Sequence, residues 1–228
     1  MTREEHIANC LQLFEKEEER FTMFSEQVKI FFQENNALNL TPLPILHSLK
    51  SRVKDKKHLE DKLNRRWNDG IEVTTENLFT EITDFAGVRV LHLHLDQFPK
   101  IHNEIMSNVN KYHEWALFEK PKAYIWDKEK ETVYRDLDIE VHTKDSNYTS
   151  IHYVIKPNPE SFVTCEIQVR TLFEEVWGEI DHAINYPHKT DSIACKEQIK
   201  VLAKLVNAGT RLADSIFASH QEHKKRGN

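Results

Sequence analysis

The segment Val163-Thr164-Cys165-Glu166-Ile167-Gln168-Val169-Arg170, followed directly by Thr171-Leu172-Phe173-Glu174, decides the fold class of this 228-residue chain. Its first eight residues alternate between apolar and polar side chains, which is the period of a strand with one buried face. The next four predict the start of a helix, because Thr171 and Glu174 have the spacing of a capping box. We expect Cys165 to be a buried thiol on the apolar face of this strand.

Three earlier segments show the same alternation and predict further strands: 88–95, 137–142 and 148–156. In the last of these, Tyr148, Ser150 and His152 share one face. Short connections favour an antiparallel meander. Its polar face is then expected to carry Tyr, His, Glu, Gln and Arg side chains next to one another.

Helical patterns flank the predicted sheet. Residues 3–37 and 192–218 repeat apolar positions at helical spacing, and residues 45–67 are rich in helix formers up to a stop at 68–70. The prolines of Thr41-Pro42-Leu43-Pro44 separate the first two patterns, and Pro187 precedes the last. We therefore expect an α+β fold with an N-terminal helical extension (1–44), a central domain (45–187), and a C-terminal helix with a disordered basic tail (188–228).

Composition limits the function classes. The five glycines are too widely spaced for a Walker A loop or a GxGxxG turn, so bound phosphates would have to be held by side chains. The net charge of −6 argues against broad nucleic-acid binding. Three separated cysteines, an acidic N-terminus and the lack of a long apolar run predict a cytoplasmic protein without membrane contact.

Two groups of residues have the chemistry of a phosphate site. Residues 50–66 hold eight Lys or Arg against three acids, which suits polyphosphate, although a solvated helix face would look the same. Asp84 and Glu166 lie in separate strand contexts and could together hold a magnesium ion or act as ligand and base, but carboxylates on half-buried strands are common. For His92 and His94 a structural role is favoured over metal binding.

Five groups of residues, spread in order over about 45–187, resemble the RelA/SpoT-type synthetase domain, the family that makes the alarmones pppGpp and ppGpp. They are Arg52-x-Lys54 with Lys62; Asp84-x-x-Gly87-x-Arg89; Tyr148-x-Ser150-Ile151-His152; Glu166 to Thr171; and Trp177 with Asp181-His182 and Tyr186. The resemblance implies a small, single-domain member with a nucleotidyltransferase-like mixed, largely antiparallel sheet flanked by helices. Its reaction would transfer the β,γ-pyrophosphate of ATP to the ribose 3′-hydroxyl of GDP or GTP.

The resemblance also implies a role for each matching residue. For ATP these are Arg52 and Arg89 on the adenine, and Lys54 and Lys62 on the phosphates. Asp84 and Glu166 would be the catalytic pair that holds Mg²⁺, with Glu166 assisting the metal or taking the 3′-hydroxyl proton. The acceptor nucleotide would contact Lys144, Tyr148, His152, Gln168 and Arg170. Without the family, Arg170 could simply pair with an acid of the next helix, and Trp177 and Tyr186 would be core residues.

The chain departs from the family pattern at His58, Asn147 and Thr149, where a serine, a glycine and a long polar residue are usual. Asparagine tolerates a left-handed backbone, so the turn before Tyr148 can survive. The altered loop leaves a second function open: a toxic relative that pyrophosphorylates the 3′ end of tRNA. A third, a catalytically silent interaction module, is disfavoured by the retained site residues. The resemblance further implies a homo-oligomer, such as a tetramer, which we expect to form through the terminal helices; helices packed within one chain are the alternative.

Overall fold

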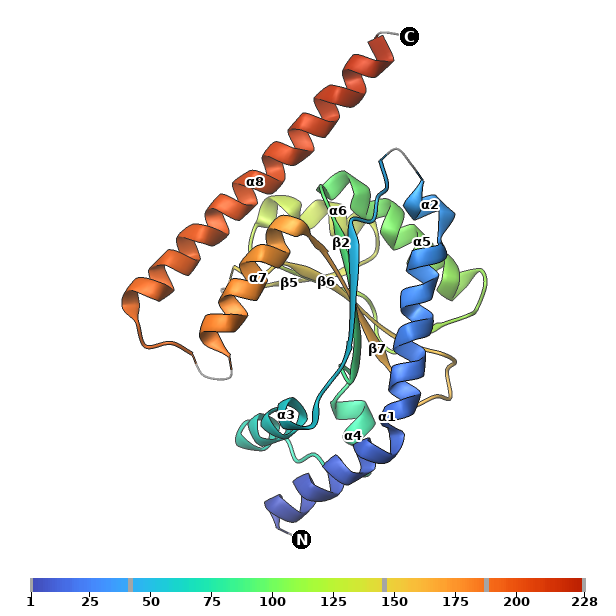
Figure 1. The fold of residues 1–228 in the computed structure, drawn as a ribbon, viewed down its shortest axis with the longest axis vertical. Coiled ribbons are helices and arrows are strands. Elements are labelled where there is room, and N and C mark those ends of the chain that lie inside the picture. The colour runs from blue at the N-terminus through green and yellow to red at the C-terminus, as the bar shows by residue number, and fades with distance from the viewer. Residues whose placement is uncertain (1, 41–42, 145–146, 187–188, 227–228) are drawn as a thin grey trace.

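A computed structural model describes residues 2–40, 43–144, 147–186 and 189–226. It contains one mixed sheet between two helical layers (Figure 1). Six strands follow the order β1-β2-β7-β6-β4-β5, and the short β3 pairs with β6. Their bounds are β1 Ser48–Val53, β2 Ala86–His92, β3 Ala116–Leu117, β4 Lys122–Ile125, β5 Glu140–Thr143, β6 Ser150–Lys156 and β7 Cys165–Thr171.

Pairing is antiparallel for β1–β2, β7–β6, β6–β4 and β6–β3, and parallel for β2–β7 and β4–β5. The sheet is thus mixed and mostly antiparallel, as the family resemblance implies. β7 lies at its centre with an apolar face of Cys165, Ile167 and Val169, all fully buried. Burial strongly raises the pKa of the Cys165 thiol, as expected for an unreactive core cysteine.

One layer is dominated by α1 (Arg3–Glu34), which packs along the apolar face of the sheet. Phe14 stacks on Phe85 with ring centroids 4.9 Å apart, and Phe21 contacts Phe85 at 5.0 Å. The same side of the molecule carries α2 (Asn36–Asn39) and α5 (Phe98–Asn110). The remaining short elements are α4 (Leu78–Glu81), η1 (Leu95–Gln97), η2 (Lys128–Lys130) and α6 (Glu131–Asp136).

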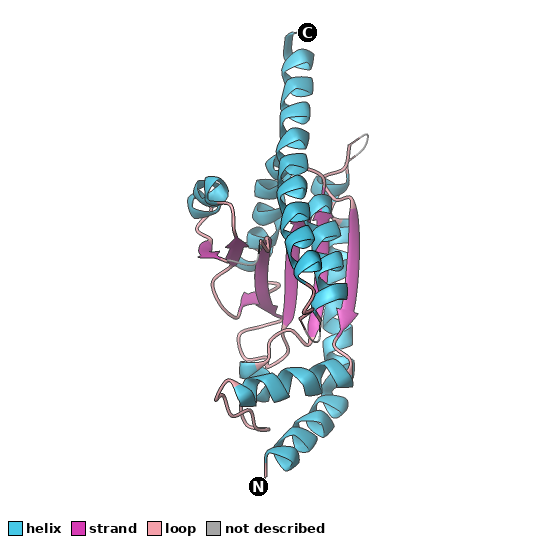
Figure 2. Cartoon of the chain, turned by 90° about the vertical axis from the view of Figure 1, so that its left-hand side faces the viewer, coloured by secondary structure: helices cyan, strands magenta, loops and turns pink. Residues whose placement is uncertain are grey.

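The other layer consists of α7 (Leu172–Asn185) and α8 (Ile193–Arg226). The capping box predicted at Thr171 and Glu174 is present, and it begins α7 directly at the end of β7. α7 therefore crosses the polar face of the sheet and covers part of it. The long α8 packs against α7 and continues past the body of the domain, as Figure 2 shows from the side. At the opposite end, α3 (Lys56–Asn68) follows β1.

Several expectations about secondary structure were wrong. Residues 48–53 form a strand and not a helix, because they pair with β2 along their whole length. The predicted antiparallel meander is wrong. β7 pairs with β2 in parallel and β5 pairs with β4, so β6 and β7 are the one predicted pair of neighbouring strands among the described residues. The strand expected at residues 137–142 begins only at Glu140, because α6 ends at Asp136 and Leu137 is its C-cap.

The termini also differ from expectation. α8 continues to Arg226, so Lys224, Lys225 and Arg226 are helical; basic side chains suit the last turn of a helix because they oppose its dipole. Residues 3–37 contain five phenylalanines, which were candidates for an oligomer interface. Four of them are buried in the chain's own core and are therefore not available to a partner: Phe14, Phe21, Phe24 and Phe32. Thr41, Pro42 and Pro187 lie outside the described residues, as do Gly227 and Asn228.

Buried residues of α1 belong to the same hydrophobic core as the sheet. The division at residues 44 and 187 stays a prediction. Within the described residues, no helix combines the length and the apolar composition needed to cross a bilayer.

Candidate active site

The polar face of the sheet carries five of the predicted site residues in two rows. Antiparallel β1 and parallel β7 place Arg52 and Glu166 on either side of Gly87. Two residues away along each strand, on the same face, the register aligns a second row: Lys50, Arg89, Gln168 and His152. Residues from four strands therefore meet although they are spread over more than a hundred positions of the sequence.

Three cavities adjoin along this face. A central cavity of about 310 Å³ is lined by Arg52, Asp84, Arg89, Glu166 and His182, among others. A basic cavity of about 230 Å³ shares Arg52, Asp84 and His182 with it and reaches Lys54, His58, Lys62, Arg65 and Tyr186. A third of about 400 Å³ is lined by Tyr124, Lys144, Tyr148, His152 and Glu166. Glu166 is the residue shared by the central and the third cavity.

Asp84 lies between the two lysines of the basic cavity. Its Oδ2 is 3.0 Å from Nζ of Lys54, and its Oδ1 accepts a hydrogen bond of 2.6 Å from Nζ of Lys62. Burial would raise the pKa of Asp84, but the two ammonium groups outweigh it and hold the pKa at about 2. Burial lowers the pKa of Lys54, against the charge of Asp84. The three groups form a charged cluster with one net positive charge.

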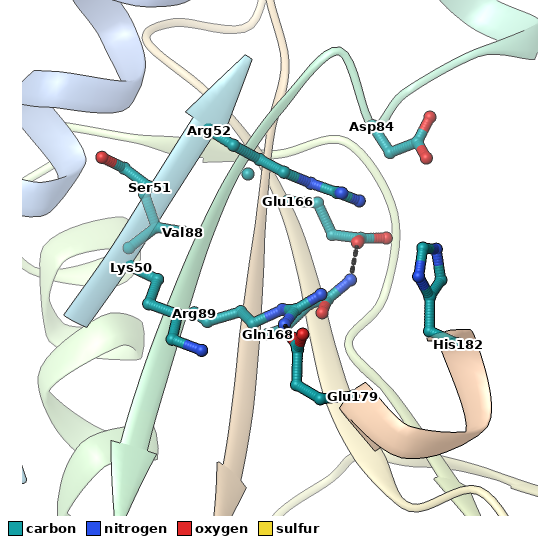
Figure 3. A pocket seen from close by; sticks show the side chains of 11 residues that line it. Lys50, Ser51, Arg52, Asp84, Val88, Arg89, Glu166, Gln168, Glu179 and His182 are labelled. Atoms are coloured by element: carbon teal, nitrogen blue, oxygen red, sulfur yellow. Dashed lines mark hydrogen bonds and ion pairs between the residues drawn. The ribbon is translucent and has the colours of Figure 1, made fainter. Parts of the chain in front are cut away.

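Arg52 and Arg89 line the central cavity, and Gly87 lies between Arg52 and Glu166. A methyl group at Gly87 would lie 3.6 Å from the carbonyl oxygen of Glu166, an ordinary contact, so the glycine matters here mainly because it leaves the floor of the cavity open. Arg89 is held by Glu175, 2.9 Å from Nη1, and by Glu179. Figure 3 shows Arg52, Arg89, Glu166 and Gln168 directed into the cavity, with His182 across it.

Glu166 is fixed through both carboxylate oxygens. Nδ1 of His152 is 3.0 Å from Oε2, and Nε2 of Gln168 donates to Oε1. Burial would raise the pKa of Glu166, and Asp84 adds to this, but the charge and hydrogen bond of His152 with the bond from Gln168 leave the pKa below its ordinary value. The carboxylate is therefore ionised at neutral pH and aimed by two neighbours.

Tyr148 precedes β6 and lies beside His152 and Arg170. Its hydroxyl is 3.0 Å from Nε2 of His152 and accepts from Nη2 of Arg170, whose guanidinium also lies 4.9 Å from the centre of the ring. Lys144 extends over the ring of Tyr124 at 4.7 Å. Asn147 has a φ of 53°, so the left-handed turn expected before Tyr148 is present.

The structure thus brings together all eleven predicted site residues, and it decides several open alternatives. Arg170 does pair with the next helix, through Glu175 at 3.4 Å, and it also reaches Tyr148. Trp177 is a core residue whose Nε1 donates to the carbonyl of Ile199. Tyr186 is not in the core: it stacks on His182, with centroids 4.6 Å apart, at the edge of the basic cavity. His92 is buried and bonded to the carbonyl of His94, which fits a structural role.

Sequence reasoning missed other residues around the site. Lys50 lies in the strand that was expected to be helical, and Tyr124 lies in β4, which was not predicted. Glu175 and Glu179 follow the recognised capping box within α7, and their four-residue spacing on a helix that begins at the site could have pointed to them.

Taken together, the fold and the site place a group of lysine and arginine side chains and two ionised carboxylates, Asp84 and Glu166, around adjoining cavities. Residues 51–191 match the family described as "Region found in RelA / SpoT proteins", and the chain belongs to that family.

Individual relatives agree. The chain is 29% identical over 177 residues to "GTP pyrophosphokinase YwaC" of Bacillus subtilis, which covers 75% of this chain and 69% of that protein. Its fold is similar to small alarmone synthetase 1 from Bacillus subtilis, with a TM-score of 0.69, 19% identity, and coverage of 92% and 98% of the two chains. The structure of that synthetase bound to its product pppGpp has a TM-score of 0.64 at 20% identity, and covers 92% and 99%.

Proposed function

We propose that this chain transfers the β,γ-pyrophosphate of ATP to the ribose 3′-hydroxyl of GDP or GTP. This is the reaction expected of a (p)ppGpp synthetase, the class of enzyme to which its family and its likeness to GTP pyrophosphokinase YwaC assign it. The observation that carries the proposal is the position of Glu166, whose ionised carboxylate lies where the central cavity meets the cavity of Tyr148. A donor in one and an acceptor in the other would meet at this group.

The donor would occupy the central and basic cavities. Arg52 and Arg89 carry planar guanidinium groups, which stack on bases as well as pair with charge. Lys54 and Lys62 would contact the phosphates. In the structure both lysines are paired with Asp84. The phosphate oxygens of ATP would replace that carboxylate as their partner and leave Asp84 ionised and available.

The acceptor would occupy the third cavity. A base can stack on Tyr148 only on the face that Arg170 leaves open, while Lys144, Gln168 and Arg170 supply donors around it. In that position the ribose 3′-hydroxyl is expected to point toward Glu166. The hydroxyl oxygen would attack the β-phosphorus, the bond from that phosphorus to the α-phosphate oxygen would break, and AMP would leave.

The hydrogen bonds around His152 support a part for it in this step. We infer that Nδ1 of His152 donates to Glu166, while Nε2 contacts the hydroxyl of Tyr148, which accepts from Arg170. This arrangement orients Glu166 with one lone pair free for the acceptor hydroxyl. Glu166 would then take the proton of the 3′-hydroxyl, the general-base role.

The carboxylates also fit a magnesium ion. Asp84 and Glu166 line the same cavity and both have lowered pKa values. Mg²⁺ is commonly bound in such sites by one or two carboxylates together with substrate phosphates, so no third protein ligand is needed. When bound, the ion neutralises charge that develops on the transferred group.

One labelling experiment tests the proposal. The protein is incubated with γ-labelled ATP and magnesium chloride, and with GDP, GTP or deacylated tRNA in separate reactions. We expect label in pppGpp or ppGpp and none in tRNA; label in tRNA alone would establish the toxic relative in its place, and label in no acceptor would contradict both.

We also propose a cytoplasmic location, which the three free cysteines support, and a homo-oligomer formed through α8.

A further inference from the structure

We propose that Glu175 is a positioning residue that holds the donor and the acceptor side of the site in one fixed geometry. This inference rests on the proposed function, since it assigns Arg89 to the donor and Arg170 with Tyr148 to the acceptor. Glu175 itself lines neither of the two cavities that these residues border.

Glu175 is paired with three cations from three strands. Its Oε1 is 2.9 Å from Nζ of Lys50 on β1 and 2.9 Å from Nη1 of Arg89 on β2. Its Oε2 is 3.4 Å from Nη1 of Arg170 on β7. The two oxygens of one carboxylate therefore divide the site: one holds the donor side and the other the acceptor side.

The surroundings make this carboxylate a rigid anchor. Its side chain is only 6% exposed, and it extends from the first turns of α7, whose start is fixed to the end of β7 by the capping box. Burial would raise the pKa of Glu175, but Lys50, Arg89 and Arg170 outweigh it and keep the group ionised. Buried charge-assisted bonds of this kind are strong and directional.

Beyond Arg170, the fixed geometry reaches the reacting group. Nη2 of Arg170 donates to the hydroxyl of Tyr148 and, at 3.1 Å, to Oε1 of Gln168. Both routes end on Glu166: Tyr148 through His152, and Gln168 directly. A shift of Arg170 would therefore move the surface on which the acceptor base stacks together with the carboxylate that receives its proton.

A neighbouring acid provides a contrast. Glu179 lies one turn further along α7 and also pairs with Arg89, but among the described residues it forms no ion pair with Arg170, and its side chain is 53% exposed. Loss of its charge should disturb Arg89 alone. The two glutamates thus separate an effect on the donor side from an effect on both sides.

The test compares Glu175→Gln with Glu179→Gln. Calorimetry measures binding of α,β-methylene-ATP, which cannot be cleaved at the bond that breaks, and initial rates give KM for GDP and kcat. For Glu175→Gln we expect the analogue's Kd and the KM for GDP each to rise about tenfold, with a lower kcat, because the geometry needed for reaction is lost on both sides. Glu179→Gln should raise only the Kd of the analogue.

Two further variants serve as controls for folding and for loss of charge. Glu175→Asp keeps the charge that the three cations need but is one methylene shorter, so it should remain folded, with a melting temperature near that of the wild type, and still weaken both substrates. Glu197→Gln removes an exposed charge on α8 that pairs with Lys200, away from the site, and should leave every constant unchanged.

The outcomes are distinct. The proposal is overturned if a folded Glu175→Asp or Glu175→Gln protein binds only one of the two substrates more weakly, or neither. It is also overturned if Glu179→Gln weakens the binding of both the ATP analogue and GDP. If wild-type protein binds the ATP analogue but transfers nothing to GDP or GTP, the proposed function fails, and the link between the two sides fails with it. If wild-type transfer is normal, the variants judge Glu175 alone.

Discussion

The ring and the hydroxyl of Tyr148 should make separable contributions to the reaction. The hydroxyl is bonded to His152 and Arg170, whereas the ring lines the proposed acceptor cavity and has one face covered by Arg170. Tyr148→Ala removes both, and Tyr148→Phe removes only the hydroxyl. The two variants therefore distinguish stacking of the acceptor from orientation of Glu166 through His152.

The expected magnitudes differ. Stacking of a base on an aromatic side chain contributes roughly 1–3 kcal/mol, so Tyr148→Ala should raise the KM for GDP by about 5- to 150-fold. A single hydrogen bond contributes about 0.5–1.5 kcal/mol net, so Tyr148→Phe should cost about 2- to 12-fold, and this loss should fall on kcat because the ring still stacks. Binding of α,β-methylene-ATP should be unchanged in both.

Initial rates with varied GDP at saturating ATP measure both effects. Tyr112→Ala is a matched control, because Tyr112 is an exposed tyrosine in a different cavity, beside α1. An unchanged KM in Tyr148→Ala would show that the acceptor does not contact this ring. Equal losses in the two variants would show that the hydroxyl, and not stacking, explains the role of Tyr148.

Four further outcomes are expected. Glu166→Gln should abolish transfer yet leave binding of α,β-methylene-ATP intact, because it removes the charge and keeps the shape; near-normal turnover would remove Glu166 from the mechanism. Arg52→Lys should weaken binding of the analogue several-fold in calorimetry if the guanidinium stacks on adenine, and an unchanged Kd would instead make Arg52 a phosphate contact or a surface charge. Asp84→Asn should lower the free energy of unfolding in urea by about 2 kcal/mol at pH 7. Because the folded pKa of about 2 lies below the ordinary 3.8, this difference should be present above pH 4 and disappear as the pH falls through 2; a difference independent of pH would contradict the ion pairs. Light scattering should find an oligomer, since α8 exposes a row of large apolar side chains: Val201, Leu205, Leu212 and Ile216. A 27.0 kDa particle at micromolar concentration would contradict this.

The sequence predicted best the parts of the fold that depend on local pattern. The alternation in β7 and the capping box after it are local properties, and both are present. Strand β1 was missed for a physical reason: Lys50 and Arg52 lie on one face, but Ser51 interrupts the apolar face of Leu49 and Val53, so the alternation is weak. Its strand state is imposed by pairing with β2, which the local sequence does not record.

Pairing between distant strands was likewise out of reach. Nothing in residues 86–92 indicates that they lie parallel to β7, yet this pairing is what places Arg89 beside Gln168 and Gly87 beside Glu166. Motif resemblance predicted eleven candidate site residues but not the contacts between them. Glu175 was missed because it belongs to none of the five motif groups. Its importance comes from ion pairs between helix α7 and three strands.

These ion pairs explain how a chain with a net charge of −6 and no glycine loop can build an anion site. Three cations that are expected to meet a nucleotide phosphate or base are held in advance by carboxylates: Lys54 and Lys62 by Asp84, and Arg89 by Glu175 and Glu179. Clustered cations alone would repel one another and destabilise the fold. The two kinds of carboxylate are expected to respond differently when a nucleotide binds. Asp84 lines the cavity and can give up its lysines to phosphate oxygens, whereas Glu175 is buried outside it and keeps its arginines in place. Nucleotide binding would therefore rearrange the phosphate end of the site and leave the frame around Glu166 unchanged.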